Sequence, residues 1–309
     1  MISFRFHLIS LVAVFLALGL GVLIGTTVIN RGIVAQLENR TEDLSGQLDG
    51  IREEVAELQA LRDLWTAFGE ETREPLLAGR LAGSRVLVIA QDGTDDGSID
   101  GLLAALRSAA TTPEDVVGPI FLTGRMALRS EGERADLAEI LGMTGSEDAD
   151  DLRSQAAALL AERLAFGTAG NEILEELLGA GFLIDEGRLL HETELRSLGG
   201  PGQVVVAVAG GPAGSALNPE GFLVPLVEEL ARDEATVAAG EPVDGEEEEP
   251  AFVSLIRSDG DLVSRIATQD NLDQMPGQIG MVVAIEDLVD GVAGHYGVKD
   301  GATRSFPEL

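Results

Sequence analysis

Histidine, methionine and carboxylate side chains are the residues of this sequence that could bind a metal ion. The 309 residues include three histidines and five methionines but no cysteine, so thiolate metal sites and cysteine nucleophiles are excluded. A soft ion such as Cu(I) would therefore depend on Met and His. Beyond residue 100 these side chains are scattered, without an M-x-x-M or H-x-M cluster: Met126, Met143, His191, Met275, Met281 and His295. Met281 falls in an apolar helical run and is expected in the core.

The candidate metal ligands that remain are His295, Asp270 and Asp273. Both aspartates come just before a helix that Pro276 is expected to open, where a carboxylate stabilises the helix N-terminus. We therefore prefer helix capping for the two aspartates, and we predict no cofactor.

His191 has Glu194 three residues later, which is not the H-E-x-x-H spacing of a zinc helix. We expect a surface histidine there.

Two loops that follow predicted strands have the topology of a phosphate-binding loop but not its residues. The loop at 92–97 carries three aspartates, the loop at 210–219 lacks the lysine of a P-loop, and neither has the G-x-G-x-x-G spacing. The sequence also lacks the G-x-S-x-G motif that presents a serine nucleophile. We therefore expect that the protein is not an enzyme.

The formal net charge of −32 comes from 53 acidic and 21 basic residues. Binding to the phosphates of DNA or RNA needs clustered Lys and Arg, so the composition excludes nucleic acid as a partner. The most acidic stretch, "GEPVDGEEEEP" at 240–250, is expected to be an exposed loop.

Strand-like and helix-like segments alternate from residue 80 onward. The segment at 85–90 is a continuous apolar run of buried-strand length, and the segment at 203–211 repeats this pattern. Further strands are predicted at 115–123, at 235–239 and within the stretch that begins at 262. Helices are predicted at 99–109, 131–141, 150–166, 171–180, 219–231 and 277–289. This alternation predicts an α/β domain at 80–309 with a mainly parallel sheet covered by helices.

Residues Leu8 to Ile29 form a largely apolar run of 22 residues, in which Ser10, Thr26 and Thr27 are the polar side chains. As a helix the run would be about 33 Å long, which matches the roughly 30 Å hydrocarbon core of a bilayer. The alternative is a cleaved signal peptide, but its apolar region is shorter and precedes an A-x-A-like site that is absent here. We therefore predict a permanent single-pass membrane anchor at 1–30. The short basic leader favours a cytoplasmic N-terminus and an extracytoplasmic C-terminal domain.

Two spacing patterns predict a homo-oligomer. Gly21 and Gly25 belong to a small-xxx-small pattern, which lets membrane helices approach closely. At 31–69 apolar residues follow a heptad spacing with charged neighbours, as in a coiled-coil stalk. Gly69, Pro75, Gly79 and Gly83 are expected to interrupt the helix beyond it. The predicted interface consists of Gly21, Gly25, Leu37, Leu44, Leu48, Ile51, Val55 and Leu58. The alternative is one amphipathic helix that packs on the globular domain.

Four segments follow one another in a recognisable order: "MISFRFHLISLVAVFLALGLGVLIGTTV", the heptad stalk, "RVLVIA" at 85–90 and "IATQDNLDQMPGQIGMVVAIEDLVDGVAGHYG" at 266–297. Together they resemble the actinobacterial copper transporter family, the mycobacterial copper transport protein B group, over nearly the whole chain. The most specific residues are Asp270-Asn271, Pro276-Gly277 and the stretch from Gly294 to Gly297. The resemblance implies a cell-envelope protein of copper export, described for the family as a channel-like outer-membrane component, with copper as the transported ion.

Three hypotheses about function follow. The first is a membrane-anchored envelope protein that supports copper transport, efflux and homeostasis together with envelope partners. The second is a structural or scaffolding protein that does not handle metal, and the third is an envelope enzyme. The sequence lacks the repeated segments of about ten alternating residues that form a transmembrane β-barrel. The residues therefore support envelope anchoring but not a pore, and they assign no copper ligand.

Overall fold

The computed structural model describes residues 4–143, 148–167, 171–185, 192–210, 217–243 and 252–307. Side chains are described at 6–25 and from residue 40 onward within these ranges, except at 192–194. His191, loop residues 211–216, the acidic residues 244–250 and the side chains of Leu37 and Glu194 therefore lie outside the described residues. The chain divides into two compact units, Met1–Ala67 and Phe68–Leu309.

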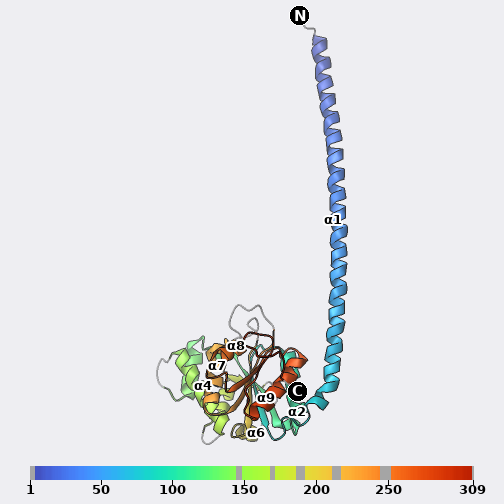
Figure 1. The fold of residues 1–309 in the computed structure, drawn as a ribbon. Coiled ribbons are helices and arrows are strands. Elements are labelled where there is room, and N and C mark those ends of the chain that lie inside the picture. Colours follow the sequence, from blue (N-terminus) through green and yellow to red (C-terminus); the bar gives the residue numbers. More distant parts are fainter. Residues whose placement is uncertain are drawn as a thin grey trace. The chain divides into compact units, whose positions relative to one another are not determined.

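The first unit consists of one helix, α1 (Phe4–Leu77), which continues into the second unit (Figure 1). Its segment Phe6–Gly25 has a mean hydropathy of 2.7 and is, among the described helices, the one long and apolar enough to cross a membrane. The large apolar side chains from Phe6 to Ile24 are 54–73% exposed. The structure thus has one candidate membrane-spanning helix at the predicted position.

The predicted interruption of the helix at Gly69 and Pro75 is wrong, because α1 continues through both residues, whereas the helix does end at Leu77, just before Gly79. Glycine inside a helix costs only about 1 kcal/mol relative to alanine. The side chain of Met275 occupies the space where a side chain at Gly69 would lie, and Leu77 is fully buried in the core of the second unit. Packing at these positions outweighs the weak local signals.

The second unit is built on one seven-stranded sheet with the order β3-β2-β1-β4-β5-β6-β7. Neighbouring strands are parallel except β2 and β3, which are antiparallel. The strands are β1 (Arg85–Gln91), β2 (Val116–Leu122), β3 (Leu183–Ile184), β4 (Gln203–Val208), β5 (Thr236–Gly240), β6 (Ile266–Gln269) and β7 (His295–Tyr296). The predicted mainly parallel sheet is therefore confirmed.

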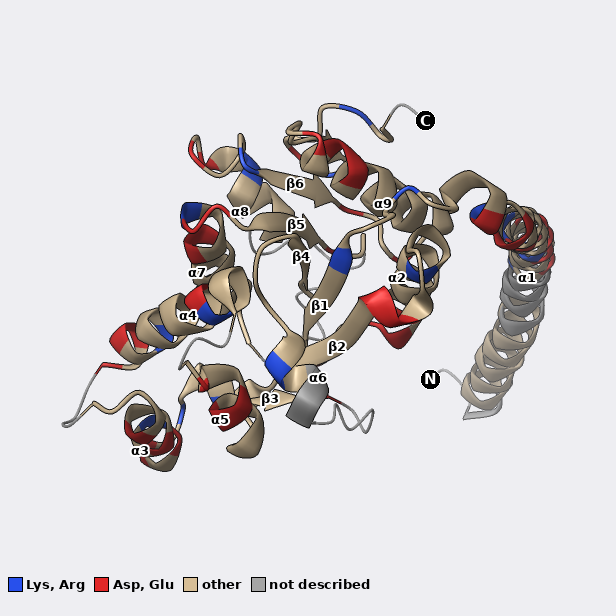
Figure 2. Cartoon of the chain, turned by 90° about the horizontal axis from the view of Figure 1, so that it is seen from below, with Lys and Arg blue, Asp and Glu red and all other residues tan. Residues whose placement is uncertain are grey.

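Helices cover both faces of this sheet. They are α2 (Asp96–Ala109), α3 (Glu131–Ile140), α4 (Ala149–Phe166), α5 (Ile173–Gly179), α6 (Glu192–Ser197), α7 (Pro219–Arg232), α8 (Phe252–Ser258) and α9 (Met275–Val289). Short 3-10 turns lie at Pro113–Asp115 and Gly124–Ala127. In Figure 2, α4 and α7 lie on one side of the strands and α2 and α9 on the other.

The two faces of the sheet belong to two separate hydrophobic cores. In β1, Leu87 and Ile89 face the core of α4 and α7, whereas Val86 and Val88 face the core of α2 and α9. Side chains alternate between the faces of a strand, so a strand buried on both faces must be apolar throughout. This requirement explains the continuous apolar run at 86–90, which follows the exposed Arg85.

Candidate functional site

The fold places its first candidate site between β1 and β4, where the strand order reverses. Open α/β sheets bind ligands at this position, outside the carboxyl ends of the strands. Here the buried Gln91 donates from Nε2 to Leu217 O at 3.1 Å and accepts at Oε1 from Gly210 N at 3.3 Å. Thr94 lies 3.2 Å from the point where a side chain on Gly210 would begin. The chain's own groups thus fill the described part of this site.

The loop at 92–97 uses one of its aspartates to begin a helix. The carboxylate of Asp95 accepts hydrogen bonds from the backbone N–H of Ser98 at 2.7 Å and from its hydroxyl at 2.9 Å, and it caps α2. The negative charge that a phosphate would bring to a helix N-terminus is therefore supplied by the chain itself.

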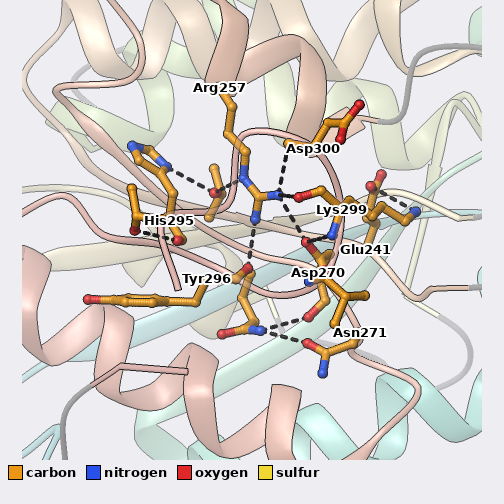
Figure 3. Close-up of polar contacts among 12 residues, drawn as sticks. Glu241, Arg257, Asp270, Asn271, His295, Tyr296, Lys299 and Asp300 are labelled. Carbon is orange, nitrogen blue, oxygen red and sulfur yellow. Dashed lines mark hydrogen bonds and ion pairs between the residues drawn. The ribbon is translucent and has the colours of Figure 1, made fainter. Parts of the chain in front are cut away.

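A second candidate site lies at the carboxyl ends of β5, β6 and β7 (Figure 3). We refer to it as the carboxyl-edge cluster, which consists of Glu241, Arg257, Thr268, Asp270, His295 and Lys299. Glu241 follows β5, Thr268 and Asp270 lie at the end of β6, and Arg257 reaches in from α8. Their side chains are buried, so every charge in the cluster needs a partner.

Arg257 and Asp270 form the centre of the cluster. Arg257 Nη1 lies 2.9 Å from Asp270 Oδ2, and the two side chains are 1% and 0% exposed. Asp270 also accepts from Val298 N at 2.6 Å and Lys299 N at 3.1 Å. Arg257 Nη2 donates to Tyr296 O at 2.7 Å. Both oxygens of the candidate ligand Asp270 are therefore already engaged by the protein.

The preferred interpretation of the two aspartates as caps of the helix at Pro276 is wrong. The N-cap residue of α9 is Gln274, which makes no capping bond with its side chain. Asp270 instead joins α8 to the C-terminal segment, and Asp273 Oδ1 accepts from Val243 N at 2.8 Å, beyond the end of β5. Both carboxylates connect segments that are distant in sequence.

His295 uses both ring nitrogens within the fold. Nε2 lies 2.8 Å from the carbonyl oxygen of Val263 and must donate to it. Arg257 Nε donates to Thr268 Oγ1 at 2.8 Å, so the Thr268 hydroxyl can donate its proton to His295 Nδ1 at 2.9 Å. This chain of bonds requires the neutral ring. Burial is the main cause of the lowered pKa of His295. The hydrogen bond to the carbonyl oxygen of Val263 raises the pKa, and the positive charge of Arg257 lowers it further.

Glu241 and Lys299 form a second buried ion pair, with Oε1 and Nζ 3.0 Å apart and side chains 4% and 7% exposed. Lys299 Nζ also donates to Pro242 O at 3.0 Å. Burial raises the pKa of Glu241, and the charge of Lys299 only partly opposes this effect. The ammonium group of Lys299 balances the charge of the Glu241 carboxylate and occupies the position that a bound cation would take.

The backbone after β6 explains much of the stretch "QDNLDQMPGQIG". Asn271 has a φ of 58°, in the left-handed region that asparagine tolerates better than most residues. Its side-chain oxygen accepts from Gln269 Nε2 at 2.7 Å. A side chain at Gly277 would collide with the carbonyl group of Asn271. These residues are required for a tight turn and for the close approach of α9, so their presence in this stretch needs no bound ligand to explain it.

The methionines that the structure describes are packed in the fold. Met126 and Met281 are fully buried in separate hydrophobic cores, as was expected of Met281, and Met275 packs against Gly69. Among the described residues, no group of three or more His, Asp or Glu side chains is arranged to bind a metal ion. The described part of the chain thus offers no assembled site for a resident copper ion.

A groove beside α7 and α8 contains two adjoining hollows of about 400 and 390 Å³, which share Glu228, Asp259 and Leu262. Asp259 Oδ1 accepts from the backbone N–H groups of Asp261 at 2.8 Å and Leu262 at 3.0 Å. Burial first, and the charge of Asp259 second, raise the pKa of Glu228. The groove is lined by the carboxylates of Glu220, Glu228, Asp259 and Asp261 and by the guanidinium groups of Arg232 and Arg265, so acidic side chains outnumber basic ones there.

The predicted stalk residues form an exposed apolar stripe on α1. Leu44, Leu48, Ile51, Val55 and Leu58 are 45–59% exposed. Beyond Leu58 the stripe continues through Leu61 and Trp65. The spacings from Val55 to Leu58 and from Leu58 to Leu61 are both three residues, which departs from the alternating spacing of three and four and corresponds to a stammer in a coiled coil. This shift leaves Arg62 beside the stripe, where it pairs with Asp63 at 3.3 Å.

The two predicted halves of the oligomer interface lie on different faces of α1. At about 100° per residue, Gly21 lies about 140° around a continuous helix from Leu44, and Gly25 has the same offset from Leu48. A side chain at either glycine would meet open space. The glycine pattern therefore does not extend the apolar stripe of the stalk.

Sequence reasoning identified Asp270 and His295 but missed Glu241, Arg257 and Lys299 as their partners. One signal was available, because Lys299 is the only lysine in a chain otherwise rich in arginine. The contacts could not have been assigned from spacing, since Arg257 and Lys299 lie on opposite sides of Asp270 in sequence.

Comparison with known proteins agrees with the resemblance seen in the sequence. The family model described as "Copper transport outer membrane protein, MctB" matches residues 1–307. The chain is 28% identical to Copper transporter MctB of Mycobacterium tuberculosis over 316 residues, with 98% of each chain covered. It is 29% identical to Copper transporter MctB of Mycobacterium leprae over 318 residues, again with 98% of each chain covered. The chain therefore belongs to the MctB family of copper transport proteins.

Proposed function

We propose that this protein is held in the cell envelope by its N-terminal helix and takes part in copper transport in the direction of efflux. The family match over residues 1–307 carries the proposal, because it includes the apolar segment as well as the α/β unit. Copper is the cargo in this proposal, and homeostasis follows from its removal. The activity is transport support without an enzymatic step.

The apolar segment supports permanent anchoring. Phe6–Gly25 exposes its large side chains along its whole length. At roughly 25 cal/mol for each Å² of apolar surface, such a helix is stable only when lipid or protein covers it. The basic leader and the acidic remainder of the chain favour an extracytoplasmic α/β unit.

Pairing of the stalk with a second copy is part of the same proposal. Two copies anchored in one membrane have the same direction, so their apolar stripes from Leu44 to Leu58 would meet in register as a parallel coiled coil. Each copy would cover the 45–59% exposed side chains of the other. The stripe is self-complementary, which is the requirement of a two-fold interface.

A scaffolding protein without a direct role in copper handling is the second candidate. The engagement of the candidate ligands favours it, because Asp270, Asp273 and His295 all bond to the protein itself. In this alternative the stalk and the α/β unit would organise envelope partners.

Growth of a deletion strain over a range of copper concentrations separates the two candidates. The copper proposal predicts that deletion lowers the copper concentration that stops growth and that the full-length chain restores it. A strain with Met126→Leu and Met281→Leu is the matched test of direct ligation, because these swaps conserve core volume. We expect that strain to grow like the wild type. Unchanged copper tolerance after deletion would favour scaffolding.

A further inference from the structure

The last described residues, Val298–Pro307, cross the carboxyl ends of β5, β6 and β7, and we refer to them as the C-terminal strap. Lys299 and Asp300 of the strap lie directly against Arg257 and Asp270 in Figure 3. The strap thus covers the carboxyl ends of these three strands, on the same edge of the sheet as the β1–β4 switch point.

Polar contacts hold the strap in place. Val298 N and Lys299 N donate to Asp270, Arg257 Nη1 donates to Asp300 O at 3.3 Å, and Lys299 pairs with Glu241. Farther along, Thr303 donates from both its N–H and its hydroxyl to His295 O. These contacts connect the strap to three strands and to α8.

Apolar burial contributes little to this attachment. Every residue from Val298 to Phe306 is exposed or half-buried, and the two large apolar side chains, Val298 and Phe306, are 63% and 46% exposed. Pro307 is the buried apolar residue at the end of the strap. A segment with few buried apolar contacts has a low free energy of local opening.

Opening would return two buried charges to water. Glu241 and Lys299 are each less than 10% exposed in the closed arrangement. Because both charges lose their hydration there, the intact pair adds only a modest net stabilisation to the closed state, whereas loss of one partner leaves the other charge uncompensated. Gly297, with a φ of 130°, immediately precedes the strap and is suited to act as its hinge.

We propose that the C-terminal strap is a lid that opens as one unit about Gly297 in the otherwise native protein, and that the Glu241–Lys299 ion pair keeps it closed. The open state uncovers the carboxyl-edge cluster while the seven-stranded sheet stays intact. Opening as a unit differs from fraying of a chain end, in which residues detach one after another from the C-terminus. The inference does not depend on the role in copper transport.

Acylation of the single lysine tests local opening directly. Full-length protein in detergent is treated with an amine-acylating reagent at increasing, sub-denaturing urea concentrations, and the peptide that contains Lys299 is quantified by mass spectrometry. We expect a rate of acylation nearly independent of urea, because opening the strap exposes little surface. A rate that rises with urea as steeply as amide exchange in β1 would mean that global unfolding is required, and would overturn the proposal.

Amide hydrogen exchange of the same protein separates a lid from a fraying end. We expect the amides of Val298, Lys299 and Thr303 to exchange with one common opening free energy, equal to that from Lys299 acylation. A graded series, with Thr303 opening far more readily than Val298 and Lys299, would show fraying and contradict the lid.

Glu241→Gln tests the ion pair as the closing contact. The variant leaves the Lys299 ammonium buried without a counter-charge only in the closed state, so we expect acylation to rise by roughly tenfold or more. Glu175→Gln is the matched control, since Glu175 of α5 pairs at 3.2 Å with the fully buried Arg163 of α4, and neither residue belongs to the carboxyl-edge cluster. We expect no change in that control. Equal rates in Glu241→Gln and the wild type would refute the role of the ion pair.

Discussion

Asp270 shows how one side chain joins distant parts of this molecule. Its carboxylate binds the guanidinium of Arg257 from α8 and two backbone N–H groups from the C-terminal strap. The strap approaches so closely that a side chain at Gly297 would collide with Asp270. Replacing the charge would therefore affect the helix, the end of β6 and the strap together.

We predict that Asp270→Asn lowers the free energy of unfolding by about 3–5 kcal/mol, because it leaves Arg257 buried without a counter-charge. Asp273→Asn is the control, since Asp273 is half-buried and accepts one backbone bond, and we expect a loss of about 1 kcal/mol. Urea unfolding of both variants checks the difference. Equal losses would contradict the structural role assigned to Asp270.

His295 makes stability depend on pH in a defined direction. Its pKa in the folded protein is lowered from the ordinary value of 6.5, so the unfolded chain binds more protons as the pH falls below that value. The contribution of His295 to the free energy of unfolding must therefore decrease as the pH falls below about 6.5. We predict that His295→Gln makes the loss of stability between neutral and acidic pH less steep.

Urea unfolding at a series of pH values measures this effect, and the difference between variant and wild type isolates it from titrating carboxylates. Parallel pH profiles would mean that His295 is protonated equally in both states.

Local sequence signals identified Asp270 and His295 of the carboxyl-edge cluster and Asp273 beside it, but not the roles of the two aspartates. Asp270 and Asp273 precede a helix, and capping is the local interpretation of that position. Their actual partners include Val298 N and Val243 N, which are 28 and 30 residues away. Such contacts depend on the strand order, which no spacing in this sequence specifies.

Outside the candidate membrane-spanning segment, α1 exposes a stripe of large apolar side chains from Leu44 to Leu58. We predict that Leu44→Asp with Leu58→Asp abolishes oligomers of a soluble chain that begins at Arg31, because two charges would enter the apolar stripe. Gly46→Asp with Ala60→Asp adds the same charges on the opposite side of the helix and should leave the oligomer intact. Sedimentation measures both, and a monomeric wild-type chain would contradict the coiled coil.

Strong elements were predictable from the sequence and weak ones were not. β1 and β4 are buried on both faces and therefore have continuous apolar runs. The two-residue strands β3 and β7 are too short to have a pattern and form only against β2 and β6. The extension of α1 to Leu77 likewise depends on tertiary packing, which overrides the signals of Gly69 and Pro75.

At the scale of the whole molecule, a candidate membrane-spanning helix and an α/β unit are encoded in separate parts of the chain. The apolar anchor, the stalk stripe and the parallel sheet each follow from hydrophobic patterning. The relation to copper comes from family membership, because the described residues contain no assembled metal site. The copper-transport account therefore rests on the family, and anchoring in the envelope remains our proposal.

Cellular copper content tests that account most directly. It would be measured by mass spectrometry of washed cells for the wild type, the deletion strain, and the deletion strain carrying either the full-length chain or a secreted chain that begins at Arg31. We predict excess copper in the deletion strain, wild-type copper with the full-length chain, and no correction by the secreted chain. Wild-type copper content in the deletion strain would contradict the transport role, and full correction by the secreted chain would contradict the requirement for the anchor.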